Sequence, residues 1–194
     1  MRNRANVFLA AAFIICMIPA AALALSPYSE DFEGLNQSDT GALGAAGWVV
    51  FSDYNNADHG NGATIEALVF QEHLIGPGDV GETWIFEFDA KRGNLEGATT
   101  AAAFIKTLDP NNGYAQTNYF PIDMTTASTS WTGYAIAITI TPDLDGQLLQ
   151  TGFSSRATNY EGSGVFYDNL EFYNNGDVVP IEDKSWGDVK SLFR

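Results

Sequence analysis

Cysteine is almost absent from this chain. The 194 residues contain a single cysteine, Cys16, and it falls within the apolar stretch near the N-terminus. The part of the chain that follows this stretch therefore has no thiol, which excludes disulfide cross-links and cysteine-based catalysis there. This part must fold by burying apolar surface, with or without the help of a bound metal.

Basic residues are also scarce. Nine lysines and arginines stand against 24 aspartates and glutamates, and the formal net charge is −15. A surface of this charge repels nucleic acids and anionic polysaccharides, so the sequence predicts no nucleic-acid partner. It favours neutral sugars, cations or basic partners. The alternative is that the acidic charge serves only solubility in a salty or calcium-rich exterior.

The chain has only two histidines, His59 and His73. We assign both to loops as isolated side chains, so they indicate neither a metal site nor a Ser-His-Asp constellation. The sequence also has no glycine-rich phosphate loop and no zinc-ligand spacing. Several common classes of catalytic site are therefore excluded.

Long hydrophobic runs are confined to the N-terminus. Arg2 and Arg4 precede an apolar stretch over residues 7–18, and Ala22-Leu23-Ala24 supplies the small residues of a cleavage site. We predict a secretory signal peptide of the bacterial type over residues 1–24, cleaved after Ala24, and a secreted or cell-surface protein. The alternative is a membrane anchor, which the alanine-rich end and the cleavage pattern disfavour.

The rest of the sequence consists of short β-type runs separated by turns. In residues 82–91, Trp84, Phe86 and Phe88 alternate with acidic residues, which is typical of a strand with one buried face. Turn signals recur every ten or so residues, and there is no helical period before the C-terminal tail. We predict about nine strands in an all-β antiparallel β-sandwich, with a jelly roll as the first choice. The predicted domain, a monomer, spans residues 25–174, and residues 175–194 form a linker and a short tail.

The stretch over residues 164–173 is expected to be the closing strand. It is aromatic and β-branched, and glycine- and asparagine-rich turns bound it. Asp168 lies in its middle, where a charge is costly unless it is paired or holds a metal. We expect this strand to lie beside the first one, residues 27–34, in which Asp31 and Glu33 share one face opposite Phe32.

These two ends carry a resemblance to a known family. The Glu-Asp-Phe-Glu-Gly run at residues 30–34, the Gly-Trp pair at residues 47–48 and the Val-Phe-Tyr-Asp-Asn-Leu run at residues 165–170 resemble the calcium-containing β-sandwich carbohydrate-binding modules with a galactose-binding-like jelly roll. The resemblance covers roughly residues 29–173. It implies a structural Ca²⁺ held by Glu33 and Asp168, with Asp31 as a looser candidate.

Calcium takes six to eight oxygen ligands, so a nearby loop such as residues 53–62 would have to complete the shell. The alternative is that Asp168 only accepts backbone hydrogen bonds at a strand bend. Residues 53–62 also suit an ordinary turn.

The resemblance also implies a non-catalytic protein that binds a polysaccharide or glycan, and the acidic charge favours a neutral one. Sugar binding requires flat apolar faces together with hydrogen-bonding side chains. Trp48 and Trp84 are expected in the core, because they lie in apolar strand segments. The candidate binding residues, on an outer or concave face or in a loop, are Asp89, Lys106, Tyr114, Gln116, Tyr119, Gln150, Arg156 and Tyr160.

Two other functions stay open. The first is a β-sandwich glycoside hydrolase or lyase that acts on polysaccharide, with Glu87 and Asp89 as the suspect acids. Their spacing resembles part of the Glu-x-Asp-x-x-Glu motif of sandwich β-glucanases, but Lys91 and Arg92 follow and the second glutamate is absent. We therefore assign no catalytic residue and interpret the pair as a charged outer face. The second is a cell-surface adhesion or matrix module that binds protein.

Overall fold

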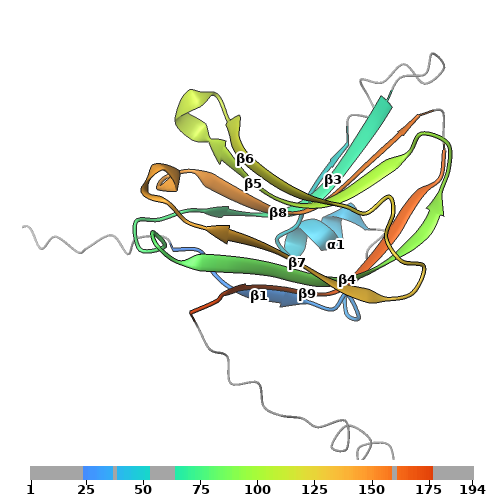
Figure 1. Cartoon of the computed structure of the whole chain (residues 1–194), viewed down its shortest axis with the longest axis horizontal. Helices are drawn as coiled ribbons and strands as arrows, with labels where there is room; N and C mark the ends of the chain where they lie inside the picture. Colours follow the sequence, from blue (N-terminus) through green and yellow to red (C-terminus); the bar gives the residue numbers. More distant parts are fainter. Residues whose placement is uncertain (1–23, 37–38, 53–63, 159–160, 177–194) are drawn as a thin grey trace, which may run out of the picture.

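The computed structural model describes residues 24–36, 39–52, 64–158 and 161–176 (Figure 1). These residues form two β-sheets packed face to face, and the described part has no helix long and apolar enough to cross a membrane. The predicted signal peptide apart from Ala24, the loop at residues 53–62 with His59, Tyr160, and the tail from residue 177 lie outside the described residues.

The two sheets contain the nine strands of the described part. The four-stranded sheet has the order β1 (Tyr28–Glu30), β9 (Ser163–Asn174), β4 (Thr83–Leu95), β7 (Thr132–Thr139). The five-stranded sheet has the order β2 (Val49–Ser52), β3 (Thr64–Leu74), β8 (Leu148–Thr158), β5 (Thr100–Asp109), β6 (Ala115–Asp123).

Every strand pairing is antiparallel. Along the chain, β3, β4 and β5 alternate between the sheets, and so do β6, β7, β8 and β9. This repeated crossing is the wrapping of a jelly roll. The predicted antiparallel β-sandwich of jelly-roll type is therefore confirmed.

The core lies between the two sheets and is rich in aromatic side chains. Trp84, Phe86 and Phe88 of β4 are buried, as their alternation predicts. Phe172 of β9 stacks on Trp84 with ring centroids 4.9 Å apart. Burial of one such ring stabilises the fold by about 1.5–3 kcal/mol, so this layer holds the two sheets together.

The first and last strands pair as predicted, but the first strand is shorter than expected. Tyr28 lies opposite Phe172, and Glu30 lies opposite Leu170. The strand ends at Glu30, because Phe32 adopts a left-handed backbone with φ of 56° and its N–H donates to Glu30 Oε1 at 2.7 Å. The strict alternation predicted across residues 31–33 is therefore wrong.

A short helix occupies part of the segment that the sequence assigns to a loop. Helix α1 (Thr40–Ala45) begins after Asp39, whose Oδ1 accepts from the N–H groups of Gly41 and Ala42 at 2.8 and 3.3 Å. It buries Leu43 in the core. Because the helix has only six residues, it is too short to show a helical period in the sequence.

Strand β2 is exposed, although Trp48 just before it lies in the core as predicted. Val49, Val50 and Phe51 are 39–50 % exposed. The reason is position, since β2 is an edge strand that pairs only with β3 in the described part of the chain. An apolar run of this length does not distinguish an edge strand from a central one.

His73 lies in β3 rather than in a loop, and its ring is part of the core. It stacks between Tyr28 and Phe172, with centroid distances of 5.7 and 5.8 Å. Its Nε2 is buried and has no hydrogen-bond partner among the residues that the structure describes. Burial lowers the pKa of His73, and the nearby carboxylate of Glu72 acts in the opposite direction.

This lowered pKa predicts a loss of stability in mild acid. Below the ordinary histidine pKa of about 6.5, the unfolded chain binds a proton that the folded His73 resists. Stability from this residue is therefore present above that pH and is lost as the pH falls toward the folded pKa. Between pH 7.5 and 5.5, we expect the melting temperature of the wild type to fall a few degrees more than that of His73→Phe. Parallel pH profiles for the two proteins would contradict this prediction.

Candidate functional site

The outer face of the five-stranded sheet is concave. In Figure 1 this sheet bends away from the four-stranded sheet on both sides, at the β5–β6 hairpin and at the start of β3. The register places Glu72 of β3 opposite Gln150 of β8, Gln150 opposite Lys106 of β5, and Lys106 opposite Tyr119 of β6. These four residues, which we call the concave row, cross the sheet at right angles to its strands.

An apolar floor lies next to the concave row. Phe70 and Phe104 are buried in the neighbouring register positions, on either side of Gly152. The Nζ of Lys106 lies 5.5 Å from the ring centroid of Phe70 and 4.9 Å from that of Phe104. The ring of Tyr119 packs 6.0 Å from that of Phe104. The row therefore combines polar side chains with aromatic surface, the combination that a sugar ring requires.

Burial perturbs two members of the concave row. It lowers the pKa of Lys106, while the carboxylates of Glu66 and Glu72 act in the opposite direction. It also raises the pKa of Tyr119, against a hydrogen bond with Ser154. Both pKa shifts arise because a charge is less well solvated on this partly buried face than in bulk water. Hydrogen bonds are also stronger here than in bulk water.

Gln150 has an unsatisfied hydrogen-bonding group at the centre of the row. Its side chain is only 4 % exposed, and its Nε2 donates to Glu72 Oε2 at 2.5 Å. Its Oε1 is buried and has no partner in the described part of the chain. A buried acceptor without a partner is costly. Because this oxygen is shielded from solvent, a hydroxyl or amide donor of a ligand reaches it only when the Gln150 side chain turns outward.

The structure brings together three of the eight candidate binding residues, Lys106, Tyr119 and Gln150. Two others lie on the same sheet, because Gln116 is exposed on β6 and Arg156 lies opposite Glu66 at the far end of β8. Tyr114 is exposed in the turn before β6 with φ of 60°.

Asp89 does not join this group, and Tyr160 lies outside the described residues. Asp89 lies in β4, on the outer face of the other sheet. Sequence reasoning missed Glu72, Phe70 and Phe104, because nothing in the pattern shows that β3, β8, β5 and β6 are neighbours in that order.

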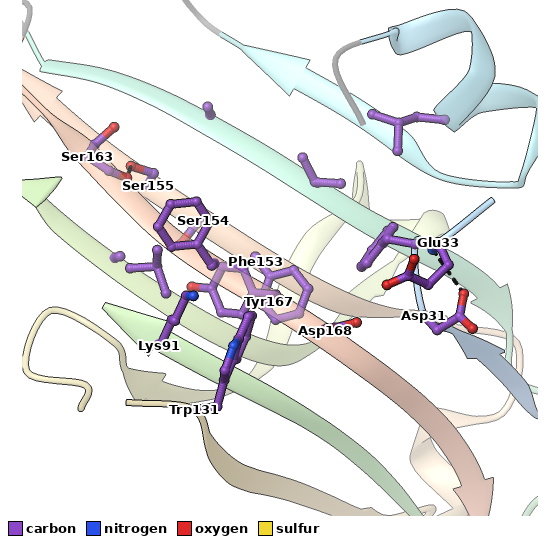
Figure 2. A pocket seen from close by; sticks show the side chains of 17 residues that line it. Asp31, Glu33, Lys91, Trp131, Phe153, Ser154, Ser155, Ser163, Tyr167 and Asp168 are labelled. Atoms are coloured by element: carbon purple, nitrogen blue, oxygen red, sulfur yellow. Dashed lines mark hydrogen bonds between the residues drawn. The ribbon is translucent and has the colours of Figure 1, made fainter. Parts of the chain in front are cut away.

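A second hollow lies between the two sheets, and we call it the inter-sheet cavity (Figure 2). Its volume is about 510 Å³, within the usual range of ligand pockets. Trp131 and Phe166 are exposed at its edge, and the Nζ of Lys91 lies 4.6 and 5.4 Å from their ring centroids. Deeper in, the hydroxyl of Tyr167 is buried without a hydrogen-bond partner in the described ranges, and burial raises the pKa of this tyrosine.

The three predicted calcium ligands all line the inter-sheet cavity, and Figure 2 shows Asp31 and Glu33 at one end of it. Asp31 Oδ1 accepts from the N–H of Glu33 at 3.0 Å. Asp168 Oδ1 accepts from the N–H of Asn169 at 2.9 Å, at a bulge where Asn169 has φ of 50°. This hydrogen bond at a strand bend is compatible with both interpretations of Asp168.

The carboxylates do not converge on one point. The described residues contain no group of three or more His, Cys, Asp or Glu side chains that could hold a metal ion. The loop that would complete the calcium shell, residues 53–62, lies outside the described residues. Calcium binding therefore stays a prediction that rests on the sequence.

Glu87 and Asp89 lie in a shallow depression on the outer face of the four-stranded sheet. Tyr173 donates its hydroxyl to Glu87 Oε1 at 2.8 Å, and Asn169 Nδ2 donates to Asp89 Oδ2 at 2.9 Å. Glu171, which lies opposite Glu87 in β9, adds a further carboxylate. The pair belongs to a hydrogen-bonded acidic face, as its alternation with buried aromatics predicts.

No protein-family model and no curated protein sequence matches the chain. A tailspike protein of bacteriophage CBA120 is similar in structure at a TM-score of 0.44 and 12 % identity, over 66 % of this chain and 19 % of its own. This chain thus spans about a fifth of that protein.

Two family 22 carbohydrate-binding modules are also similar in structure. The xylan-binding domain from Paenibacillus barcinonensis gives a TM-score of 0.41 at 10 % identity, over 79 % of this chain and 97 % of its own. The module from Clostridium thermocellum gives a TM-score of 0.42 at 16 % identity, over 78 % of this chain and 94 % of its own. Structural similarity at these TM-scores and identities does not show which ligand this chain binds. The assignment of the chain to the jelly-roll β-sandwich class rests on its own strand topology.

Proposed function

We propose that this protein is secreted and binds a neutral glycan, without cleaving it, on the concave face of the five-stranded sheet. The observation that carries the proposal is the concave row on its aromatic floor, where the exposed ring of Tyr119 lies beside the polar side chains of Lys106 and Gln150. The acidic composition favours a neutral ligand over an anionic one.

The groups of the concave row suit a sugar in complementary ways. A pyranose presents apolar C–H groups that pack on aromatic rings, and the Tyr119 ring is exposed for this purpose. The hydroxyls of a sugar both donate and accept, so one can accept from the Lys106 ammonium while another donates to Gln150 Oε1 once that side chain turns outward. These bonds are made on a partly buried face, where competition from water is reduced.

Secretion and the calcium site are parts of the same proposal. The sequence over residues 1–24 has the three regions of a signal peptide, which supports export. A Ca²⁺ held by Glu33 and Asp168, with Asp31 nearby, would supply no chemistry to a substrate. It would join the segment after β1 to β9 and stabilise the fold in proportion to its occupancy.

The test is binding of the secreted protein to an array of glycans, in calcium and again in a chelator. We expect binding to a neutral polysaccharide fragment, and a melting temperature that falls when calcium is removed. Loss of binding on chelation, with the fold retained, would mean that the metal orders the binding face as well.

Other outcomes of the same experiment would point elsewhere. A folded protein that binds no glycan under either condition contradicts the proposal and favours an adhesion module. Release of reducing ends from polysaccharide, lost in Glu87→Gln, would instead favour the hydrolase alternative. A melting temperature unchanged by the chelator would contradict the calcium site alone.

A further inference from the structure

Asp79 is a buried carboxylate that neither candidate site uses. It is 1 % exposed and closes the turn over residues 76–79, between β3 and β4. Its Oδ1 and Oδ2 accept from the backbone nitrogen of Leu25 at 3.1 and 3.0 Å, and Oδ2 also accepts from the nitrogen of Gly76 at 2.8 Å. No lysine or arginine of the described chain forms an ion pair with it.

Among the described residues, this arrangement leaves a negative charge in the interior without a cation. Two backbone amides orient their dipoles toward the carboxylate but do not neutralise it, and a buried unpaired charge is strongly destabilising. The nearly equal distances from the Leu25 nitrogen to both Asp79 oxygens also suit an ammonium donor better than a backbone amide. An amide nitrogen has a single proton to share between both oxygens, whereas an ammonium at the same position has three protons and a full positive charge.

Leu25 is the first residue after the cleavage site that the sequence predicts. Ala24 is exposed, but the side chain of Leu25 is 5 % exposed and belongs to the hydrophobic core. Leu25 is thus the first buried residue of the described chain, although Ser26 and Pro27 after it are exposed again. Hydrolysis of that bond by signal peptidase would convert the Leu25 amide nitrogen into a free α-ammonium group.

We propose that Asp79 is a receptor for the new N-terminus that signal-peptide removal creates. Water adds across the Ala24–Leu25 peptide bond, the carboxylate leaves with the signal peptide, and the ammonium of Leu25 forms a buried ion pair with Asp79. The folded domain is therefore completed only by processing at this bond. The inference rests on the proposed cleavage and not on carbohydrate binding, so each fails independently of the other.

The experiment expresses the full precursor in a secreting host and measures the intact mass of the exported protein. The control is a precursor with one alanine inserted between Ala24 and Leu25, which retains Ala22 and Ala24 at the cleavage site and places the ammonium one residue too early. Both forms are also made with Asp79→Asn. The melting temperature of all four proteins is then compared.

We expect a mass that begins at Leu25, and a melting temperature that falls by about 5 °C on insertion of the alanine. In the Asp79→Asn background, the insertion should shift it by less than about 1 °C. Equal shifts in both backgrounds, or a different N-terminus, would overturn the proposal.

A second measurement serves if Asp79→Asn does not fold. The α-amine of the exported wild type should react with an amine reagent at least about tenfold more slowly than that of the insertion form, because an ion-paired and buried ammonium is protected. Equal reaction rates would also overturn the proposal.

Discussion

Gly152→Ala is expected to destabilise the fold by about 3 kcal/mol, which lowers the melting temperature by about 9 °C. Gly152 lies in β8 at the centre of the five-stranded sheet, opposite Phe70 of β3 and Phe104 of β5. A Cβ at this position would lie 2.6 Å from the Cα of Phe70 and would collide with the carbonyl oxygen of Val69. The backbone of β3 must move to admit it, because neither neighbour is the end of a flexible side chain.

The matched control is Gly78→Ala in the turn between β3 and β4. A Cβ on Gly78 would meet nothing within 4 Å, so its melting temperature should change by less than about 2 °C. Thermal unfolding followed by circular dichroism measures both variants. If Gly152→Ala proved as stable as Gly78→Ala, the close approach of β3 and β8 described here would be wrong.

Lys106→Met is expected to weaken glycan binding by about tenfold to a hundredfold while leaving the fold intact. Methionine keeps an apolar stem over the rings of Phe70 and Phe104, but it removes the charged donor from the concave row. A hydrogen bond from a charged group contributes about 1.5–3 kcal/mol, which corresponds to this change in affinity. Isothermal titration with the glycan found on the array measures the effect.

Lys91→Met supplies a control that the chain itself offers. Lys91 also lies over two aromatic rings, those of Trp131 and Phe166, but at the edge of the inter-sheet cavity. The same chemical change there should alter the affinity by less than about twofold. If binding is instead lost in Lys91→Met and kept in Lys106→Met, the glycan binds at the inter-sheet cavity and the proposed location is wrong.

The strands and their buried faces could be predicted from local pattern. In residues 82–91, aromatic residues at every second position identify the buried side of β4 without any tertiary information. Helix α1 and the exposed edge strand β2 could not be predicted in this way. Six residues are too few to show a helical period, and an apolar run looks the same at the edge of a sheet as at its centre.

The candidate site was predictable only in part. Lys106, Tyr119 and Gln150 were expected on an outer or concave face because each is a polar or amphipathic residue within a strand. Their partner Glu72 was not predicted, since it joins them only through the order of strands in the sheet. Nor did the sequence separate Asp89 from this group, because both outer faces of a sandwich show the same alternation.

The sequence by itself determined the fold class, the acidic character and the cysteine-free nature of the predicted mature chain. These follow from residue type and short-range periodicity, which set the buried face of each strand. Only the tertiary structure decided which strands are neighbours and in what register. It thereby decided that Gln150 meets Lys106 and that Leu25 meets Asp79. Those contacts join residues that are 44 and 54 positions apart, and chain pattern over ten residues carries no information about them.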